Sequence, residues 1–208
     1  MIKKKLKKII KKWKRYHEIS NAGAITRRYF VMNAFDGALT MLGVVIGAAI
    51  SGNLQNSTII ISAGIAGSIA MGASGMSGAF MTEKAERTRK LKKLERAMLS
   101  DMKNGLHDKS HRFATIFASL VDGVSPAIAA MTVISPFFLA NFGLITPDIA
   151  FWGCIILTLV VLTMLGVYLA RISDESLIVY GLIMLFIGII TAFLCIATSL
   201  LLGGNLAI

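Results

Sequence analysis

Long apolar runs alternate with short charged or polar segments along this chain. Five runs with few or no charged residues stand out: 29–51, 59–81, 113–139, 149–170 and 177–202. A helix needs about 20 predominantly apolar residues to cross the hydrocarbon core of a bilayer, so each run is long enough to span a membrane. The connections are too short for a separate soluble domain. The pattern therefore predicts an all-α integral membrane protein with five transmembrane helices.

Two segments are rich in charge. The longer one, residues 82–112, follows the second apolar run, and we expect the second helix to extend through it into the cytoplasm. The other is a basic tail, residues 1–28, ahead of a five-span domain at 29–208. Apolar residues recur at helical spacing among its lysines: Leu6, Ile9, Ile10 and Trp13. This pattern is typical of a helix that binds anionic lipid headgroups, and a plain topology anchor is the alternative.

The basic residues all fall on one side of the predicted membrane. Eleven Lys and Arg precede Tyr29, ten lie between Lys84 and Arg112, and the last of the 22 is Arg171. The positive-inside rule makes that side cytoplasmic, which places the N-terminus inside and the C-terminus outside. We expect a prokaryotic cytoplasmic membrane, because the chain is short and shows no organelle signal.

Composition agrees with this interpretation. The chain is 55% hydrophobic, and its mean hydropathy of +0.71 is higher than one soluble core requires. The net charge of +11 lies in blocks between apolar runs rather than on one folded surface, so we expect no nucleic-acid partner.

Two carboxylates lie deep inside the predicted spans. Helical rise places Asp36 about 12 Å in from Arg28 and Asp122 about 15 Å in from Arg112. A charged group at the bilayer centre costs about 2.5–3.5 kcal/mol or more, so each should face protein or an aqueous path. Their segments, FDGALT and VDGVSP, share a dipeptide, which suggests a parallel internal repeat.

Further candidate ligands accompany these carboxylates in the first two spans. Asn33 and Thr40 share a helical face with Asp36. Met71 and Met76 lie in a glycine-rich second span, where a methionine at helical spacing can equally serve as core packing. A thioether beside a carboxylate suits a borderline transition metal better than Mg²⁺ or Ca²⁺. Asp36 with Met71 is therefore the central predicted pair.

Two more pairs lie near the predicted cytoplasmic surface. Glu83 and Glu86 are three positions apart and could collect cations at an entrance, although i,i+4 ion pairs with Arg87 and Lys90 are the alternative. His107 and His111 are spaced to bind one metal, with interfacial polar residues as the alternative.

No motif of an enzyme is present: the chain has no Ser-His-Asp set, Walker loop, dinucleotide fingerprint or HExxH. We therefore expect no enzymatic activity.

The segments NAFDGALTMLGVVIGA and AGIAGSIAMGASGMSGAFMTEKAER resemble the first two spans of the vacuolar iron transporter family. The resemblance covers residues 30–90 well and the remainder mainly by layout. It implies a five-span homodimer whose two first spans line a path for Fe²⁺ or Mn²⁺ out of the cytosol against protons. It also implies that Asp36 is the pathway aspartate and Met71 the pathway methionine.

Two departures from that family are visible. The segment 82–112 is too short for the glutamate-rich cytoplasmic bundle of the vacuolar members, which makes the chain similar to the nodulin-like branch. The second span, 59–81, has no acidic residue where some relatives carry a glutamate. We hypothesise that Asp122 supplies the missing carboxylate.

The sequence thus predicts a secondary transporter that exports Fe²⁺ or Mn²⁺ by proton antiport, with the metal as substrate and no cofactor. Carboxylate and thioether ligands accept both metals, so the choice between them stays open. Two other classes remain: a proton-coupled exporter of lipophilic cations, and a membrane scaffold that transports nothing.

Overall fold

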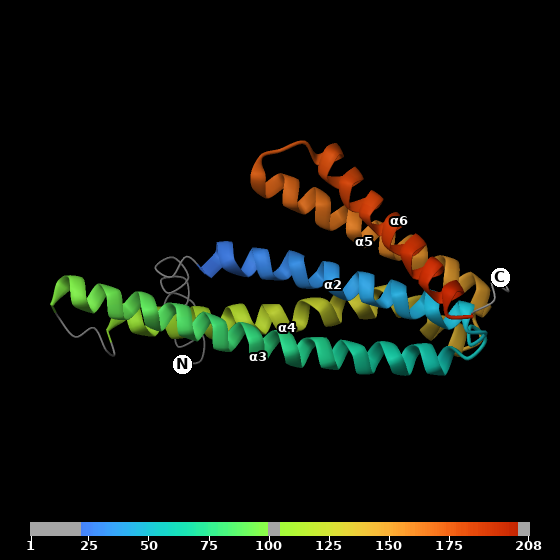
Figure 1. The fold of residues 1–208 in the computed structure, drawn as a ribbon, viewed down its shortest axis with the longest axis horizontal. Coiled ribbons are helices and arrows are strands. Elements are labelled where there is room, and N and C mark those ends of the chain that lie inside the picture. Colours follow the sequence, from blue (N-terminus) through green and yellow to red (C-terminus); the bar gives the residue numbers. More distant parts are fainter. Residues whose placement is uncertain (1–21, 100–104, 204–208) are drawn as a thin grey trace, which may run out of the picture. The chain divides into compact units, whose positions relative to one another are not determined.

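The structure, a computed structural model, describes residues 22–99 and 105–203. These residues form five α-helices and no strand (Figure 1). The helices are α2 (Ala22–Ile50), α3 (Ser57–Met98), α4 (Leu106–Asn141), α5 (Pro147–Ser173) and α6 (Leu177–Leu201). The prediction of an all-helical fold is confirmed for this part of the chain. The helix predicted within the basic tail falls on residues 1–21, outside the described residues.

All five helices are long and apolar enough to cross a membrane. The described residues thus contain the five candidate spans that were predicted, and their architecture is that of a membrane protein. Several helices extend beyond the apolar runs: α2 begins seven residues before its run at Ala22, and α4 begins at Leu106 rather than at 113. The charged segment 82–112 is divided between the end of α3 and the start of α4. Glu, Lys and Arg are good helix formers, so a helix need not stop where its apolar run does.

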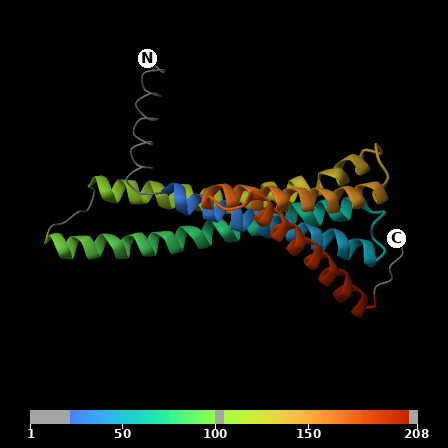
Figure 2. The same cartoon turned by 90° about the horizontal axis from the view of Figure 1, so that it is seen from above.

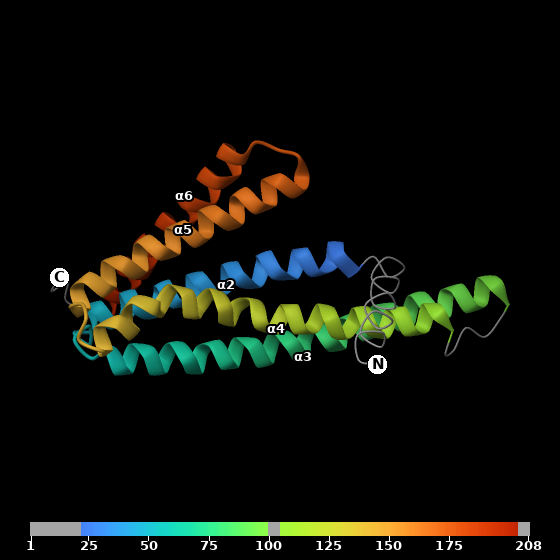
Figure 3. The same ribbon diagram turned by 180° about the vertical axis from the view of Figure 1, so that it is seen from behind.

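The helices are divided between two compact units. The first comprises Met1–Phe30 and Ala73–Val124, and the second comprises Val31–Gly72 and Ser125–Ile208. In the first unit, the charged end of α3 lies beside the start of α4, and the two run in opposite directions (Figure 2, Figure 3).

The second unit holds the main hydrophobic core, to which α2, α3, α4 and α5 contribute. Its largest fully buried side chains include Phe137, Met41 and Leu42. Gly37 of α2 lies directly against the backbone of Pro126 in α4, where an added Cβ would come within 2.7 Å of the proline Cα. Such close approach through glycine is typical of helices that pack within a membrane.

The last two helices form an antiparallel pair in the same unit (Figure 1). Thr146 caps the start of α5 by accepting a hydrogen bond from the Ile149 backbone N–H, at 3.4 Å, and Pro147 occupies the first turn. Asp174 ends α5 in the left-handed conformation, with a φ of 55°. Most of α6 is exposed in a single chain, as expected for a helix that faces lipid.

Candidate functional site

Asp36 lies on the exposed side of α2 in the second unit. Thr40, one turn further on, is also exposed, and Asn33, one turn earlier, is half-buried. The next residue after Asp36 is Gly37, which is pressed against Pro126 of α4. Because successive helical residues point about 100° apart, this contact turns the Asp36 side chain away from α4. The predicted polar face of the first span is therefore an outer face of the single chain.

Met71, the other member of the predicted pair, is half-buried and packs against the hydrophobic core of the second unit. Met76 is 38% exposed on the same helix and lies in the first unit. Among the described residues, no group of three or more His, Cys, Asp or Glu side chains could hold a metal ion. One copy of the chain thus presents Asp36 and Met71 without a surrounding set of such ligands, and their role in binding stays a prediction.

Asp122 is buried, with 5% of its surface exposed, and lies in the first unit. It packs against Gly75 of α3, where an added Cβ would lie 3.0 Å from the Asp122 Oδ2 and 3.2 Å from its backbone oxygen. Pro126, four residues later, has no N–H to donate to that backbone oxygen. The absence of a side chain at Gly75 therefore leaves room for both the carboxylate and the carbonyl of Asp122.

A polar face leads along α4 to Asp122. His111, Thr115, Ser119 and Asp122 are spaced by four, four and three residues, so they lie on one side of the helix. Ser119 Oγ donates to the Thr115 carbonyl at 2.6 Å, and Thr115 Oγ1 donates to the His111 carbonyl at 3.0 Å. Sequence reasoning singled out the two ends of this face but missed the hydroxyls between them, although their spacing carried the signal.

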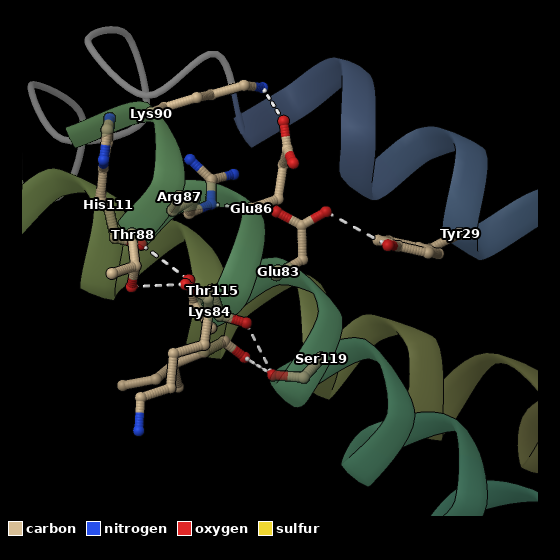
Figure 4. A network of polar contacts seen from close by, with 11 residues as sticks. Tyr29, Glu83, Lys84, Glu86, Arg87, Thr88, Lys90, His111, Thr115 and Ser119 are labelled. Atoms are coloured by element: carbon tan, nitrogen blue, oxygen red, sulfur yellow. Dashed lines mark hydrogen bonds and ion pairs between the residues drawn. The ribbon is translucent and has the colours of Figure 1, made fainter. Parts of the chain in front are cut away.

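Glu83 is held by two neighbours in the first unit (Figure 4). Tyr29 Oη donates to its Oε1 at 3.2 Å, and Arg87 Nε donates to its Oε2 at 3.0 Å. Glu83 and Arg87 are each only 7% exposed. Each carboxylate oxygen thus already accepts one hydrogen bond, and a cation at Glu83 would be repelled by the neighbouring charge of Arg87. No sequence pattern pointed to Tyr29, which is 54 positions away from Glu83.

Glu86 differs from Glu83 in being exposed. Its Oε1 lies 3.5 Å from Lys90 Nζ. The i,i+4 ion pairs that were the alternative to a metal entrance, Glu83 with Arg87 and Glu86 with Lys90, are therefore both formed. An exposed pair of this kind contributes little to stability. Glu86 is therefore the more accessible of the two predicted entrance carboxylates.

His111 is half-buried and lines a cavity between α3 and α4. Asp108, one turn earlier, is buried and forms an ion pair with Arg112, at 3.1 Å. His107 belongs to α4, but its side chain lies outside what the structure describes, so the predicted histidine pair is not tested.

Residues 22–99 and 105–203 thus form an all-helical architecture with five candidate membrane spans, which contain an exposed carboxylate, Asp36, and a buried one, Asp122. An uncharacterized protein of the archaeon Methanocaldococcus jannaschii is 38% identical to the chain over 173 residues, which cover 81% of this chain and 85% of that protein. The chain belongs to the same family as that protein. No protein-family model matches the chain, and no solved structure matches it.

Proposed function

We propose that the chain is a homodimeric secondary transporter that exports Fe²⁺ or Mn²⁺ from the cytoplasm by proton antiport. The observation that carries the proposal is the exposure of Asp36 on a helix long and apolar enough to cross a membrane. The resemblance of residues 30–90 to the vacuolar iron transporter family adds the substrate class.

An exposed carboxylate in the middle of an apolar helix must be shielded from lipid by protein or water. Facing lipid, it would cost about 2.5–3.5 kcal/mol or more. In a two-fold dimer the same face of both copies meets at the axis. The face with Asn33, Asp36 and Thr40 would then be buried against its own copy, and two Asp36 carboxylates would balance the charge of one divalent cation. Met71 would add a thioether, a ligand that favours transition metals.

The charge distribution supports the orientation of the chain in the membrane. The cytoplasmic side in this proposal holds the start of α2 and the charged ends of α3 and α4, because Lys and Arg concentrate there. Glu86 is exposed in that region and would attract metal ions before they reach the spans.

Asp122 takes the proton in this proposal. It is the buried one of the two carboxylates within apolar helices, and it lies against Gly75 at the end of a polar face of α4. The face of His111, Thr115 and Ser119 gives it a line of polar groups toward the charged end of α4.

Metal flux into proteoliposomes tests the proposal. Anaerobic Fe²⁺ and Mn²⁺ uptake is measured together with internal pH for the wild type and for Asp36→Asn, Met71→Ala and Asp122→Asn. We expect Asp36→Asn to abolish uptake, Met71→Ala to weaken it, and Asp122→Asn to uncouple uptake from proton movement. Asp174→Asn is the matched control, because it removes a carboxylate outside the apolar helices at a left-handed position that Asn tolerates.

Each alternative class has its own outcome in this assay. Proton-coupled movement of a lipophilic cation without metal flux would favour the lipophilic-cation exporter over the metal exporter. If no cation moves and Asp36→Asn behaves as wild type, the interpretation as a non-transporting membrane scaffold is favoured. Unchanged proton coupling in Asp122→Asn would remove Asp122 from the mechanism while leaving the role of Asp36 intact.

A further inference from the structure

A cavity of about 580 Å³ lies in the first unit between the charged end of α3 and the start of α4. Its volume is in the range of sites that hold small ligands. Figure 4 shows Arg87 and Thr88 of α3 beside His111 and Thr115 of α4, four residues that line it. None of the three residues proposed to carry transport, Asp36, Met71 and Asp122, lines this cavity.

The lining carries more positive than negative charge. Four cationic side chains, Lys84, Arg87, Lys92 and Arg112, face two acidic ones, Glu95 and Asp108, which leaves an excess of two positive charges. Asp108 is paired with Arg112, at 3.1 Å.

Arg87, which lines this cavity, has unused hydrogen-bonding capacity. Its Nε is bonded to Glu83, but its buried Nη2 has no hydrogen-bond partner among the described residues. A buried charged donor without a partner is destabilising, so an acceptor from outside the chain would stabilise the protein. Phosphate oxygens are strong acceptors for a guanidinium.

The cavity also has an apolar end. Phe80 and Ile116 are 37% and 53% exposed, and both belong to the apolar runs of their helices. On α3 the cationic residues come after Phe80, and on α4 Arg112 comes before Ile116. The lining therefore includes both the apolar and the charged part of each helix. Lys84 Nζ lies 5.8 Å from the centre of the Phe80 ring, where charge and apolar surface meet. Phospholipids have their phosphate and the start of their acyl chains at this boundary.

We propose that this cavity binds a phosphate group, and that its natural ligand is an anionic phospholipid whose headgroup lies among Lys84, Arg87 and Lys92 while its chains follow Phe80 and Ile116. Basic pockets between membrane helices on the cytoplasmic side are typical sites for anionic headgroups. A free phosphate would use the same cations but gain nothing from the apolar end. The proposal does not depend on what the protein transports.

Thermal melting of the delipidated full chain in detergent tests the site. Phosphatidylglycerol, phosphatidylcholine and inorganic phosphate are each added to three proteins: the wild type, Lys84→Gln with Lys92→Gln, and Lys93→Gln with Lys109→Gln. The second double variant is the matched control, because it removes the same charge from exposed lysines of α3 and α4 that do not line the cavity. All four lysines are exposed, so neither variant disturbs the core.

We expect phosphatidylglycerol to raise Tm by roughly 5 °C in the wild type and the control, with little shift in the cavity variant. Phosphatidylcholine should give little shift in any of them. An equal shift from inorganic phosphate, lost in the cavity variant, would keep the phosphate site but assign it to a free anion. Equal loss of the phosphatidylglycerol shift in both double variants would show general charge attraction and overturn the proposal, as would no shift in the wild type.

Discussion

Two segments with the same Asp-Gly dipeptide, FDGALT in α2 and VDGVSP in α4, place their carboxylates in opposite environments. Asp36 is exposed on an outer face of the second unit, whereas Asp122 is 5% exposed inside the first. Both lie well within apolar helices, and their distances from the charged ends of their spans predicted similar depths. Shared local sequence therefore did not lead to a shared environment.

Glycine contacts explain the difference. At the first segment the glycine after the aspartate, Gly37, makes the close contact with Pro126, and the carboxylate points elsewhere. At the second, the aspartate itself lies in the contact, against Gly75 of a neighbouring helix. In the proposed mechanism the enclosed carboxylate takes the proton. The exposed one would meet the same face of a second copy and share a metal ion with it.

The largest effect should come from enlarging the glycine beside the exposed aspartate. In Gly37→Ala the new methyl would overlap the backbone carbonyl of Pro126, a residue that is fully buried. Backbone atoms cannot rotate away, so we expect a loss of about 3 kcal/mol in the free energy of unfolding, the upper end of the range for overpacking. Gly47→Ala on the same helix has no atom within 4 Å of its added Cβ and should be neutral or slightly stabilising.

Melting curves in detergent compare these two variants. Similar melting temperatures for Gly37→Ala and Gly47→Ala would mean that α2 does not pack on α4 through Gly37. The contact between Gly37 and Pro126 could then not explain why the Asp36 side chain points away from α4.

A smaller effect is expected from neutralising the two aspartates themselves. Asp122→Asn replaces a buried carboxylate oxygen by an NH₂ group, and mismatched buried polar groups cost about 1–3 kcal/mol. Asp36→Asn changes an exposed group, so the stability of the single chain should change by less than about 0.5 kcal/mol. Chemical or thermal unfolding in detergent measures both. Greater destabilisation by Asp36→Asn than by Asp122→Asn would reverse the assignment of exposed and buried sites.

Much of the fold followed from the sequence because the spans depend on local composition. Five apolar runs predicted five helices, and the structure has one for each. The helix ends were less predictable: α4 begins at Leu106, seven residues before its apolar run, in a turn where Asp108 and Arg112 form an ion pair. Hydrophobicity marks where a helix can enter the membrane, whereas hydrogen bonding and helix propensity decide where it ends.

The environment of each candidate residue was much less predictable. Exposure of Asp36 depends on how α2 is rotated against α4, which is fixed by a contact between residues 37 and 126. The hydrogen bond from Tyr29 to Glu83 joins residues 54 positions apart, and no local pattern predicts it. The bond from Arg87 to Glu83 has i,i+4 spacing and could be predicted. Long-range packing contacts of this kind have no periodicity within one helix.

Of the two close glycine contacts, the smaller effect is expected at the glycine that faces the buried aspartate. An added Cβ at Gly75 would lie 3.0 Å from Asp122 Oδ2, the end of a side chain, and 3.2 Å from the Asp122 carbonyl oxygen. A shift of a few tenths of an ångström relieves both contacts, so Gly75→Ala should destabilise by only about 1 kcal/mol. Gly78→Ala, one turn along α3, has nothing within 4 Å and should gain about 0.5–1 kcal/mol from helix propensity.

A double-mutant cycle with Asp122→Ala shows whether the aspartate causes that cost. If the contact is responsible, Gly75→Ala should become nearly neutral once the Asp122 carboxylate is removed, because only the carbonyl contact remains. Gly78→Ala should give the same change with or without Asp122. An unchanged cost of Gly75→Ala in the Asp122→Ala background would place the strain elsewhere on α3. The buried carboxylate would then owe its position to something other than this glycine, and the contrast with Asp36 would need a different cause.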